Sequence, residues 1–323
     1  MIGFLIRRTI QALIVIFFVT AVVFVLGRLV PGGEARAALG PQHATPFNIA
    51  HFNRINGLDL PLWDQFYHYI RGLIWPFWHP NLGYSFHYDQ RVLNVISDRL
   101  PRTLSLVGAS TLLALIIAVP LGILQVVRRN SLLDYSLTAV SFIFYAMPSF
   151  LLGTLLILFF SFDVKAFPVS PPDQSTFWTI FADPRAFILP VFTLAAITIA
   201  SFSRYMRSSM MDAMAEDYVR TAVAKGASSR RVLFGHALRN ALIPILTLVG
   251  LSLPAIVSGA LITESVFNYP GMGLLTVQSA LSDDIPTVLG TTLVITVATV
   301  FGSLLADVLY AVADPRIRFG SAS

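Results

Sequence analysis

Six long apolar runs constrain the fold of this 323-residue chain more than any other feature of its sequence. Their approximate bounds are 9–30, 104–127, 135–162, 187–206, 241–262 and 287–312. A helix needs about 20 residues to cross about 30 Å of hydrocarbon, and each run is long enough. Because lipid offers no hydrogen-bond partners, a spanning backbone must satisfy its own donors and acceptors, as a helix does. We therefore expect an all-α integral membrane protein with six transmembrane helices.

Composition supports the same class of protein. Hydrophobic residues make up 55% of the chain and charged residues 12%, whereas a typical soluble domain has about 25% charged residues. The chain has no cysteine, which excludes disulfides and thiolate metal sites. The first run is too long for a signal peptide, and no small-x-small cleavage site precedes Arg28. We expect this run to form the first transmembrane helix.

Basic residues predict the orientation, because positive charge concentrates in the cytoplasmic loops of membrane proteins. The net charge of +5 therefore marks those loops and does not indicate nucleic-acid binding. With the N-terminus inside, the inner segments hold Arg7, Arg8, Arg128, Arg129, Arg204, Arg207, Arg220, Lys225, Arg230, Arg231, Arg239, Arg316 and Arg318. The short outer segments hold only Lys165 and Arg185, and the segment 31–101 is too long to count. We expect both termini to be cytoplasmic.

The long outer segment between the first two runs is rich in aromatic residues, proline and histidine. Within it, a set of apolar residues at helical spacing predicts a short amphipathic helix on the outer membrane surface. These residues are Trp63, Phe66, Tyr67, Ile70, Leu73 and Ile74. The segment is either a structural lid or a docking surface, and its residues do not decide between the two.

Prolines interrupt the second run at Pro120 and the third at Pro148. A proline removes a backbone donor and kinks a helix, so these positions either border a cavity or moving segment or make ordinary packing kinks. In the turn between the two runs, Asp134 is the expected cap of the next helix.

Ionisable side chains are absent from the middle of the six runs: Arg204, Glu264 and Asp307 lie near run ends. Proton- and ion-driven transporters need such residues within the membrane. The chain also lacks a GxxxxGK[ST] phosphate loop, an HExxH helix and a GxSxG elbow. We expect no catalytic residue and no metal site, and any uphill transport must draw its energy from another subunit. The histidines are scattered, at 43, 51, 68, 79, 87 and 236.

The most polar helix-forming loop, from Asp212 to Pro244, separates the fourth and fifth runs. Good helix formers fill 212–225, Gly226 then stops the helix, and Ser228 or Ser229 caps a second one. One apolar stripe of the first helix holds Tyr218, Val219, Ala222 and Val223, and one face of the second holds Val232, Leu233, His236 and Ala237. The loop either docks a soluble partner or rests on lipid headgroups, and both alternatives stay open on physical grounds alone.

This loop is similar to the cytoplasmic signature of permease subunits of binding-protein-dependent ABC importers. That signature reads Glu-Ala-Ala, three residues, Gly, and later Ile-x-Leu-Pro; this chain has Arg220-Thr221-Ala222, Gly226 and Leu242-Ile243-Pro244. The departures match the dipeptide, oligopeptide and nickel branch, which reads much like DYVRTARAKG…RHALRNALIP. Further stretches resemble the same branch: GLDLPLWDQF…LGYS, LPRTLSLV, SLLDY…PSFLLGTLLI, TESVFNYPGMG and DVLYAVADPRIR. The chain differs at 74–80, where Trp75, Trp78 and His79 replace a Gly-Asp-rich turn.

The resemblance implies a fold like that of type I ABC importer permeases. It divides the chain into a first helix (1–30), an extracytoplasmic insertion or lid (31–100) and a five-helix core (101–323) with a coupling loop at about 207–240. It also implies ATP-driven import of di- or oligopeptides by alternating access in a bacterial inner membrane. The implied partners are a homologous second permease, two cytoplasmic ATPases, an extracytoplasmic binding protein, the peptide and the lipid bilayer. ATP and magnesium would bind the ATPases, and this chain would carry no cofactor.

The resemblance assigns one group of site residues. The residues expected to couple to the ATPases are Glu216, Asp217, Tyr218, Arg220, Thr221, Ala222, Lys225 and Gly226. The turn-rich segment after the fifth run, which carries one acidic group, either helps to form an outer gate or is an ordinary packed turn. The residues expected at that gate or along the substrate path are Pro148, Glu264, Asn268 and Tyr269. The alternatives are import of nickel or another small solute by the same machinery and a non-transporting membrane anchor of a cytoplasmic complex. A membrane enzyme is the least supported.

Overall fold

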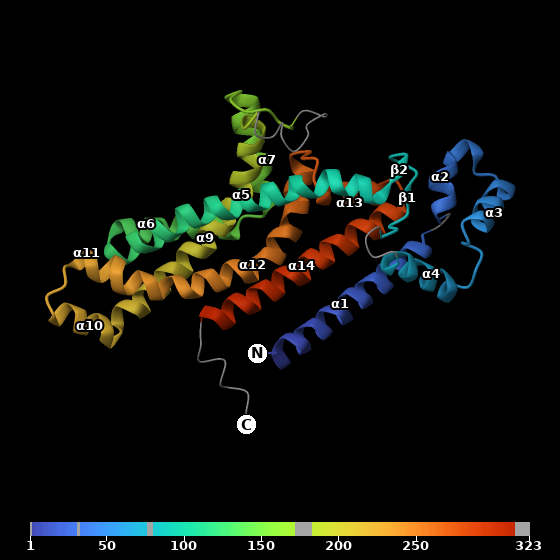
Figure 1. Cartoon of the computed structure of the whole chain (residues 1–323). Coiled ribbons are helices and arrows are strands. Elements are labelled where there is room, and N and C mark those ends of the chain that lie inside the picture. Colours follow the sequence, from blue (N-terminus) through green and yellow to red (C-terminus); the bar gives the residue numbers. More distant parts are fainter. Residues whose placement is uncertain (1, 31–32, 76–79, 172–182, 314–323) are drawn as a thin grey trace. The chain divides into compact units, whose positions relative to one another are not determined.

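The computed structural model describes residues 2–30, 33–75, 80–171 and 183–313. Helices dominate it, and the strands β1 (Tyr84–Ser85) and β2 (Gln90–Arg91) form one short antiparallel hairpin. In chain order the helices are α1 (Ile2–Arg28), α2 (Gly33–His43), α3 (Pro46–Ile55), α4 (Leu62–Ile74), α5 (Val92–Val127), α6 (Leu132–Ala146), α7 (Ser149–Leu156), η1 (Ile157–Asp163), α9 (Arg185–Ala215), α10 (Asp217–Ala224), α11 (Ser229–Arg231), η2 (Val232–Ala237), α12 (Leu238–Val266), α13 (Met272–Leu281) and α14 (Ile285–Ala313) (Figure 1). The expected all-α fold is confirmed.

Among the described residues, five helices are long and apolar enough to cross a membrane. They are Ile6–Arg28, Val92–Val127, Arg185–Ala215, Ser229–Gly250 and Ile285–Leu304. The pair Leu132–Ala146 and Ser149–Asp163 makes a sixth span if it is counted as one, but it is bent by 103°. The expected run over 135–162 is therefore present as two helices, with the expected kink at Pro148, and the expectation of six spans holds if the pair is one broken span. Met147 is extended (φ −79°, ψ 126°) because the ring of Pro148 disfavours a helical residue before it.

The chain divides into two compact units, and the division falls inside α5 and inside α14. The first unit takes its described residues mainly from 2–103 and 270–300, and the second from 104–171, 183–269 and 301–313. Each unit is described by itself below.

In the first unit, α4 packs against α1 through aromatic side chains. Phe24 is 1% exposed, and its ring centroid lies 5.2 Å from that of Phe66 and 5.5 Å from that of Tyr69. The amphipathic helix expected at 63–74 is present, but its expected apolar stripe is only partly buried. Trp63 and Tyr67 are 74% and 57% exposed, because α1 covers the neighbouring face.

A second cluster in this unit joins the hairpin to α5, α13 and α14. Its buried members are Leu82, Val92, Val95, Ile96, Met272 and Leu275. Gly290 lets α14 approach α5 closely: a Cβ atom there would lie 2.6 Å from Cγ1 of Val92. Thr103 Oγ1 accepts a hydrogen bond of 2.8 Å from the Met272 backbone N–H and so supports the start of α13.

In the second unit, α9 contacts α6, α7 and α12. Gly122 of α5 lies against it, since an added Cβ would be 2.6 Å from Cβ of Met206. One buried cluster lines this group near Leu189, Leu194 and Tyr269. Another lies around Met206 and Met210 and reaches into the polar loop at Val219 and Val232. The loop is therefore part of the packed unit.

An ion pair ties α6 to α9. Arg207 donates from Nε to Oδ1 of Asp134 at 3.0 Å and from Nη2 to Oδ2 at 2.9 Å. Arg204 lies with its guanidinium 5.2 Å from the ring centroid of Phe142 and 4.2 Å from that of Tyr145. Arg204 lies near the end of the fourth apolar run, as predicted, but within α9, because that helix continues beyond the run to Ala215.

The predicted cap of α6 is corrected by the same region. Ser131, with extended backbone, is the N-cap, and its Oγ accepts from the Asp134 N–H at 3.3 Å. Asp134 stands three residues further on and accepts instead from the Asn130 N–H at 3.1 Å. The shorter serine side chain reaches the first turn, which leaves the carboxylate available to Arg207.

Candidate functional site

The composition of the loop between α9 and α12 predicts one helix over 212–225, but the structure has a break in that range. Helix α9 ends at Ala215, Glu216 is extended (φ −70°, ψ 149°), and α10 begins at Asp217. The break redirects the chain, so that Val219 and Ala222 of α10 pack in the same cluster as Met210 of α9. Burial of these side chains outweighs the helical propensity of the local sequence.

Helix α10 ends at a glycine, as predicted. Gly226 has φ 77°, a left-handed conformation that glycine adopts without strain. Its N–H donates to the Val223 carbonyl at 2.9 Å, and the Ala227 N–H donates to the Ala222 carbonyl at 3.1 Å. These two bonds form a Schellman motif, which fixes the direction in which the chain leaves α10.

The predicted apolar stripe of α10 is divided between two faces. Val219 and Ala222 are buried, at 3% and 8% exposed, whereas Tyr218 and Val223 are 37% and 58% exposed. Tyr218 comes directly before Val219, and Val223 comes directly after Ala222. One position along a helix is a rotation of about 100°, so both side chains point away from the core. An aromatic and an aliphatic side chain are thus presented outward.

The second helix of the loop is capped by Ser228, whose Oγ accepts from the Arg231 N–H at 3.4 Å. This resolves the choice between Ser228 and Ser229. Helix α11 continues through η2 into α12, and Pro244 lies inside α12 without ending it. Val232 and Ala237 are buried, at 3% and 0% exposed, as their predicted face requires.

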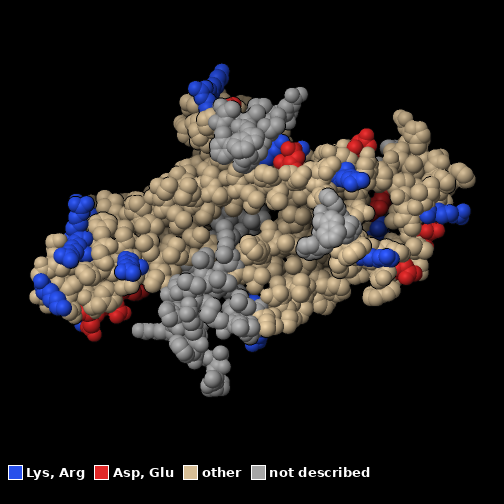
Figure 2. Space-filling model, in the orientation of Figure 1, with Lys and Arg blue, Asp and Glu red and all other residues tan. Residues whose placement is uncertain are grey.

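A cavity of about 590 Å³ lies between α10 and η2. It is lined by Tyr218, Thr221, Ala222, Lys225, Gly226, Ala227, Arg231 and His236. Five of the eight predicted coupling residues therefore share one surface: Tyr218, Thr221, Ala222, Lys225 and Gly226. We call this surface the loop cavity. Its polar edge carries Lys225 and Arg231, and Figure 2 shows Lys and Arg side chains gathered at the end that holds α10 and α11.

The other three predicted coupling residues lie outside the loop cavity. Glu216 is the exposed residue between α9 and α10. Asp217 and Arg220 form an ion pair of 3.4 Å with side chains 95% and 74% exposed. An exposed pair of this kind contributes at most about 1 kcal/mol to stability. Both side chains are therefore accessible to a partner and have little structural role.

The predicted outer-gate residues are not brought together as a set. Glu264 and Tyr269 are 0% and 1% exposed, and the Tyr269 N–H donates to the Glu264 carbonyl at 2.7 Å. Asn268 between them is exposed, with φ 47°. Pro148 is exposed at the bend between α6 and α7. The turn after α12 is therefore closely packed around one outward residue, and a gating role for it stays a prediction.

No group of three or more His, Cys, Asp or Glu side chains in the described part of the chain is arranged to hold a metal ion. The distribution of basic residues predicts only a cytoplasmic position for Arg207 and indicates no partner for it. Its ion pair with Asp134 spans 73 residues of sequence, and no local pattern indicates it.

Comparison with known proteins places these features in a family. Residues 118–319 match the family model described as binding-protein-dependent transport system inner membrane component. Residues 1–107 match the N-terminal model of the same transport systems. The two matches cover both compact units and the whole loop between α9 and α12.

Curated relatives match over nearly their full length. The oligopeptide transport system permease protein AppB of Bacillus subtilis is 36% identical over 321 residues, covering 99% of this chain and 100% of the relative. The di/tripeptide transport system permease protein DppB of Pseudomonas aeruginosa is 35% identical, with 98% and 99% covered. The dipeptide transport system permease protein DppB of Escherichia coli is 33% identical, with the same coverage. This multi-pass membrane protein belongs to the family of inner membrane components of binding-protein-dependent transport systems.

Proposed function

We propose that this chain is a transmembrane permease subunit of an ABC importer of di- or oligopeptides. The observation that carries the proposal is the loop cavity, on the segment that joins two membrane-spanning helices. A cavity with an exposed aromatic side chain and two cationic side chains suits a helix end or acidic edge of a soluble partner. Peptide as the substrate is supported by the relatives, which are named as peptide permeases.

The proposed assembly contains a homologous second permease, two cytoplasmic ATPases and an extracytoplasmic peptide-binding protein. ATP and magnesium bind the ATPases, and this chain contributes no catalytic residue and no cofactor. The complex lies in the bacterial inner membrane, with both termini of this chain in the cytoplasm. Residues 31–100 form an extracytoplasmic lid.

Packing supports a route for energy from the ATPases to the membrane spans. Val219 and Ala222 of α10 share a buried cluster with Met206 and Met210 of α9 and with Ile245 of α12. A force on α10 therefore acts on two spans at once. Since Asp134 binds Arg207, α6 follows α9. Movement of these helices together would change which side of the membrane the subunit opens to, and coupling of this kind is a free energy shared between two sites.

The experiment is a substitution at Gly226 in the reconstituted complex with its ATPases and binding protein. We expect Gly226→Asp to abolish most peptide-stimulated ATP hydrolysis without preventing assembly. An Asp residue is strained at φ 77°. Nothing lies within 4 Å of a Cβ added at Gly226, so the new carboxylate would protrude at the surface of the loop cavity, where the partner is expected to dock. Gly235→Asp is the matched control, because Gly235 is exposed in the same loop, has no positive φ and does not line the cavity.

Uptake assays decide the substrate and the alternatives. Trialanine accumulation by the complete complex supports the proposal, whereas accumulation of Ni²⁺ instead would assign the chain to metal import. A complex that accumulates neither, with ATPases that hydrolyse ATP at an unstimulated rate, would favour a membrane anchor. Normal stimulation in an assembled Gly226→Asp complex would remove the loop cavity from the coupling route.

A further inference from the structure

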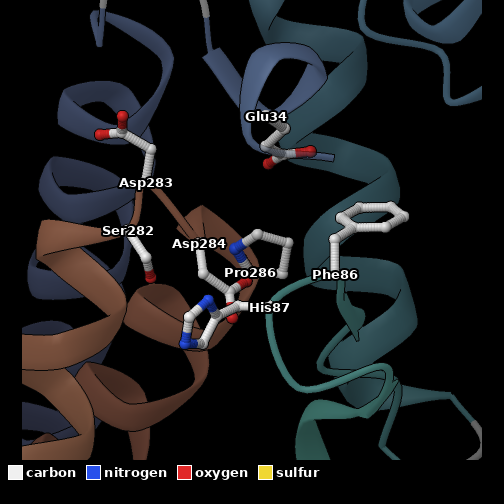
Figure 3. Close-up of a pocket in the computed structure, with 7 residues that line it drawn as sticks. All are labelled: Glu34, Phe86, His87, Ser282, Asp283, Asp284 and Pro286. Carbon is white, nitrogen blue, oxygen red and sulfur yellow. The ribbon is translucent and has the colours of Figure 1, made fainter. Parts of the chain in front are cut away.

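A second cavity, of about 190 Å³, lies entirely within the first unit. It is lined by Glu34, Phe86, His87, Ser282, Asp283, Asp284 and Pro286. Figure 3 shows these side chains coming from α2, from the turn between β1 and β2, from the segment between α13 and α14, and from the first turn of α14. Phe86, His87 and Asp283 are exposed, so the cavity opens to solvent, whereas Asp284 is 3% exposed. We call it the acidic cavity.

Asp284 is held in place by one of its two carboxylate oxygens. Oδ2 accepts hydrogen bonds from Ser85 Oγ at 2.5 Å and from Thr287 Oγ1 at 2.7 Å. Oδ1 is fully buried and accepts no hydrogen bond from the described residues. A carboxylate has about four acceptor positions, and leaving a buried charged oxygen without a donor is costly. One side of this group therefore has unused capacity for a donor.

The other buried acid of the cavity already has its cation. Glu34 Oε1 accepts from Arg28 Nη1 at 2.6 Å, and the two side chains are 10% and 18% exposed. Burial raises the pKa of the Glu34 carboxyl, Arg28 opposes that rise, and the charge of Asp284 adds to it. The single guanidinium offsets one of two buried carboxylates, so the cavity keeps a negative charge.

The wall of the cavity favours an organic cation over a metal ion. Phe86 packs edge-to-face with Tyr84 and Phe52, with centroid distances of 5.6 and 5.4 Å. An aromatic ring beside a carboxylate attracts an ammonium group through its negative face. A metal ion would need several anionic or imidazole ligands, and no such group of three is present among the described residues.

We propose that the acidic cavity binds the free α-ammonium group of a transported peptide, with the Asp284 carboxylate as the acceptor and Phe86 as the aromatic wall. The inference rests on the proposed function, which supplies peptides with a free amino terminus. It assigns a substrate contact to the first unit, at residues distinct from the predicted outer-gate residues.

Asp284→Asn tests the proposal with little change in shape. The amide oxygen of Asn can accept the hydrogen bonds from Ser85 and Thr287. The NH₂ group takes the place of Oδ1, which accepts no hydrogen bond from the described residues, so the substitution breaks none of these bonds. Phe86→Leu is a second variant at a position 38% exposed, where a substitution is tolerated. Asp59→Asn is the matched control, because it removes an exposed carboxylate of the same unit that does not line the cavity.

The measurement is ligand-detected NMR of trialanine and of N-acetyl-trialanine with the permease pair and ATPases in nanodiscs, without the binding protein. We expect the affinity for trialanine to fall about tenfold in Asp284→Asn, as for loss of one charged hydrogen bond. Phe86→Leu should weaken it about threefold, as for loss of a partly exposed cation–π contact. Asp59→Asn should match the wild type, and N-acetyl-trialanine should bind the wild type as weakly as trialanine binds Asp284→Asn.

Three results would overturn the proposal. The first is equal binding of the two peptides, or wild-type affinity in Asp284→Asn. The second is displacement of bound trialanine by millimolar Ca²⁺, which would make the cavity a site for a metal ion. The third is unchanged trialanine binding with loss of binding-protein docking in Asp284→Asn, which would assign the cavity to a lysine of that protein. Trialanine uptake by the wild-type complex separates these failures from failure of the proposed function.

Discussion

Loss of the ion pair between α6 and α9 should destabilise the second unit by an amount that depends on which partner is removed. The side chain of Asp134 is 2% exposed and that of Arg207 is 30% exposed. Breaking a buried pair costs about 3–5 kcal/mol because it leaves an unpaired charge, and exposure of one partner lowers that value. Arg207→Ala leaves the buried carboxylate alone, so we expect a loss of about 3 kcal/mol. Asp134→Ala leaves the Arg207 guanidinium, which is 30% exposed and reaches water, so we expect about 2 kcal/mol.

The absence of cysteine supplies the assay. A cysteine placed at Ala195, which is 0% exposed in α9, reacts with a thiol dye only when the helix packing opens. Losses of about 2–3 kcal/mol correspond to thermal midpoints about 3–5 °C lower for a chain of this size. The double variant should lose less than the sum of the two single losses, because both remove the same contact. Additive losses would refute the shared contact, and a larger loss in Asp134→Ala than in Arg207→Ala would refute the assigned asymmetry.

Three further predictions concern other parts of the chain. Glu34 has a raised pKa, so its contribution to stability is present below its ordinary value of 4.5 and is lost as pH rises through the raised value; the thermal midpoint relative to Glu34→Gln should therefore fall as the pH rises above 4.5, and a flat difference would contradict this. A cysteine at Asn268 should give crosslinks that differ between nucleotide-free and ATP-trapped complexes, whereas an unchanged pattern, with state changes recorded elsewhere, would make the turn after α12 purely structural. The chain reconstituted alone should accumulate no peptide with ATP or with a pH gradient, because accumulation needs a coupled energy source; uptake driven by a pH gradient alone would indicate a secondary transporter.

The sequence predicted those features that depend on local composition. Apolar length located the spans, and Gly226 marked the end of α10 because few other residues adopt φ 77°. Features that depend on tertiary packing were missed. The break at Glu216 lies in a segment without glycine or proline, so the local sequence does not indicate it. We attribute the break to the burial of Val219 and Ala222.

The acidic cavity was missed for a similar reason. The local signal was the adjacent pair Asp283–Asp284 in the short segment between the last two apolar runs, and paired acids in a loop are common on exposed surfaces. Ser85, which binds Asp284, lies 199 residues away in sequence. By contrast, the kink at Pro148 was predicted from the proline itself, and only its angle of 103° depends on packing that the local sequence does not show.

The helical segments α11, η2 and α12 follow one another without a break, so a movement at the α11 end is transmitted along α12. The segment Ser229–Gly250 has 22 residues, and at 1.5 Å per residue it is about 33 Å long. A tilt of about 10° at its α11 end swings the far end by about 6 Å, which is roughly the thickness of one helix turn along its axis. A soluble partner that shifts the short α10–α11 corner by a small angle would therefore produce a displacement as wide as a peptide backbone on the opposite side of the unit.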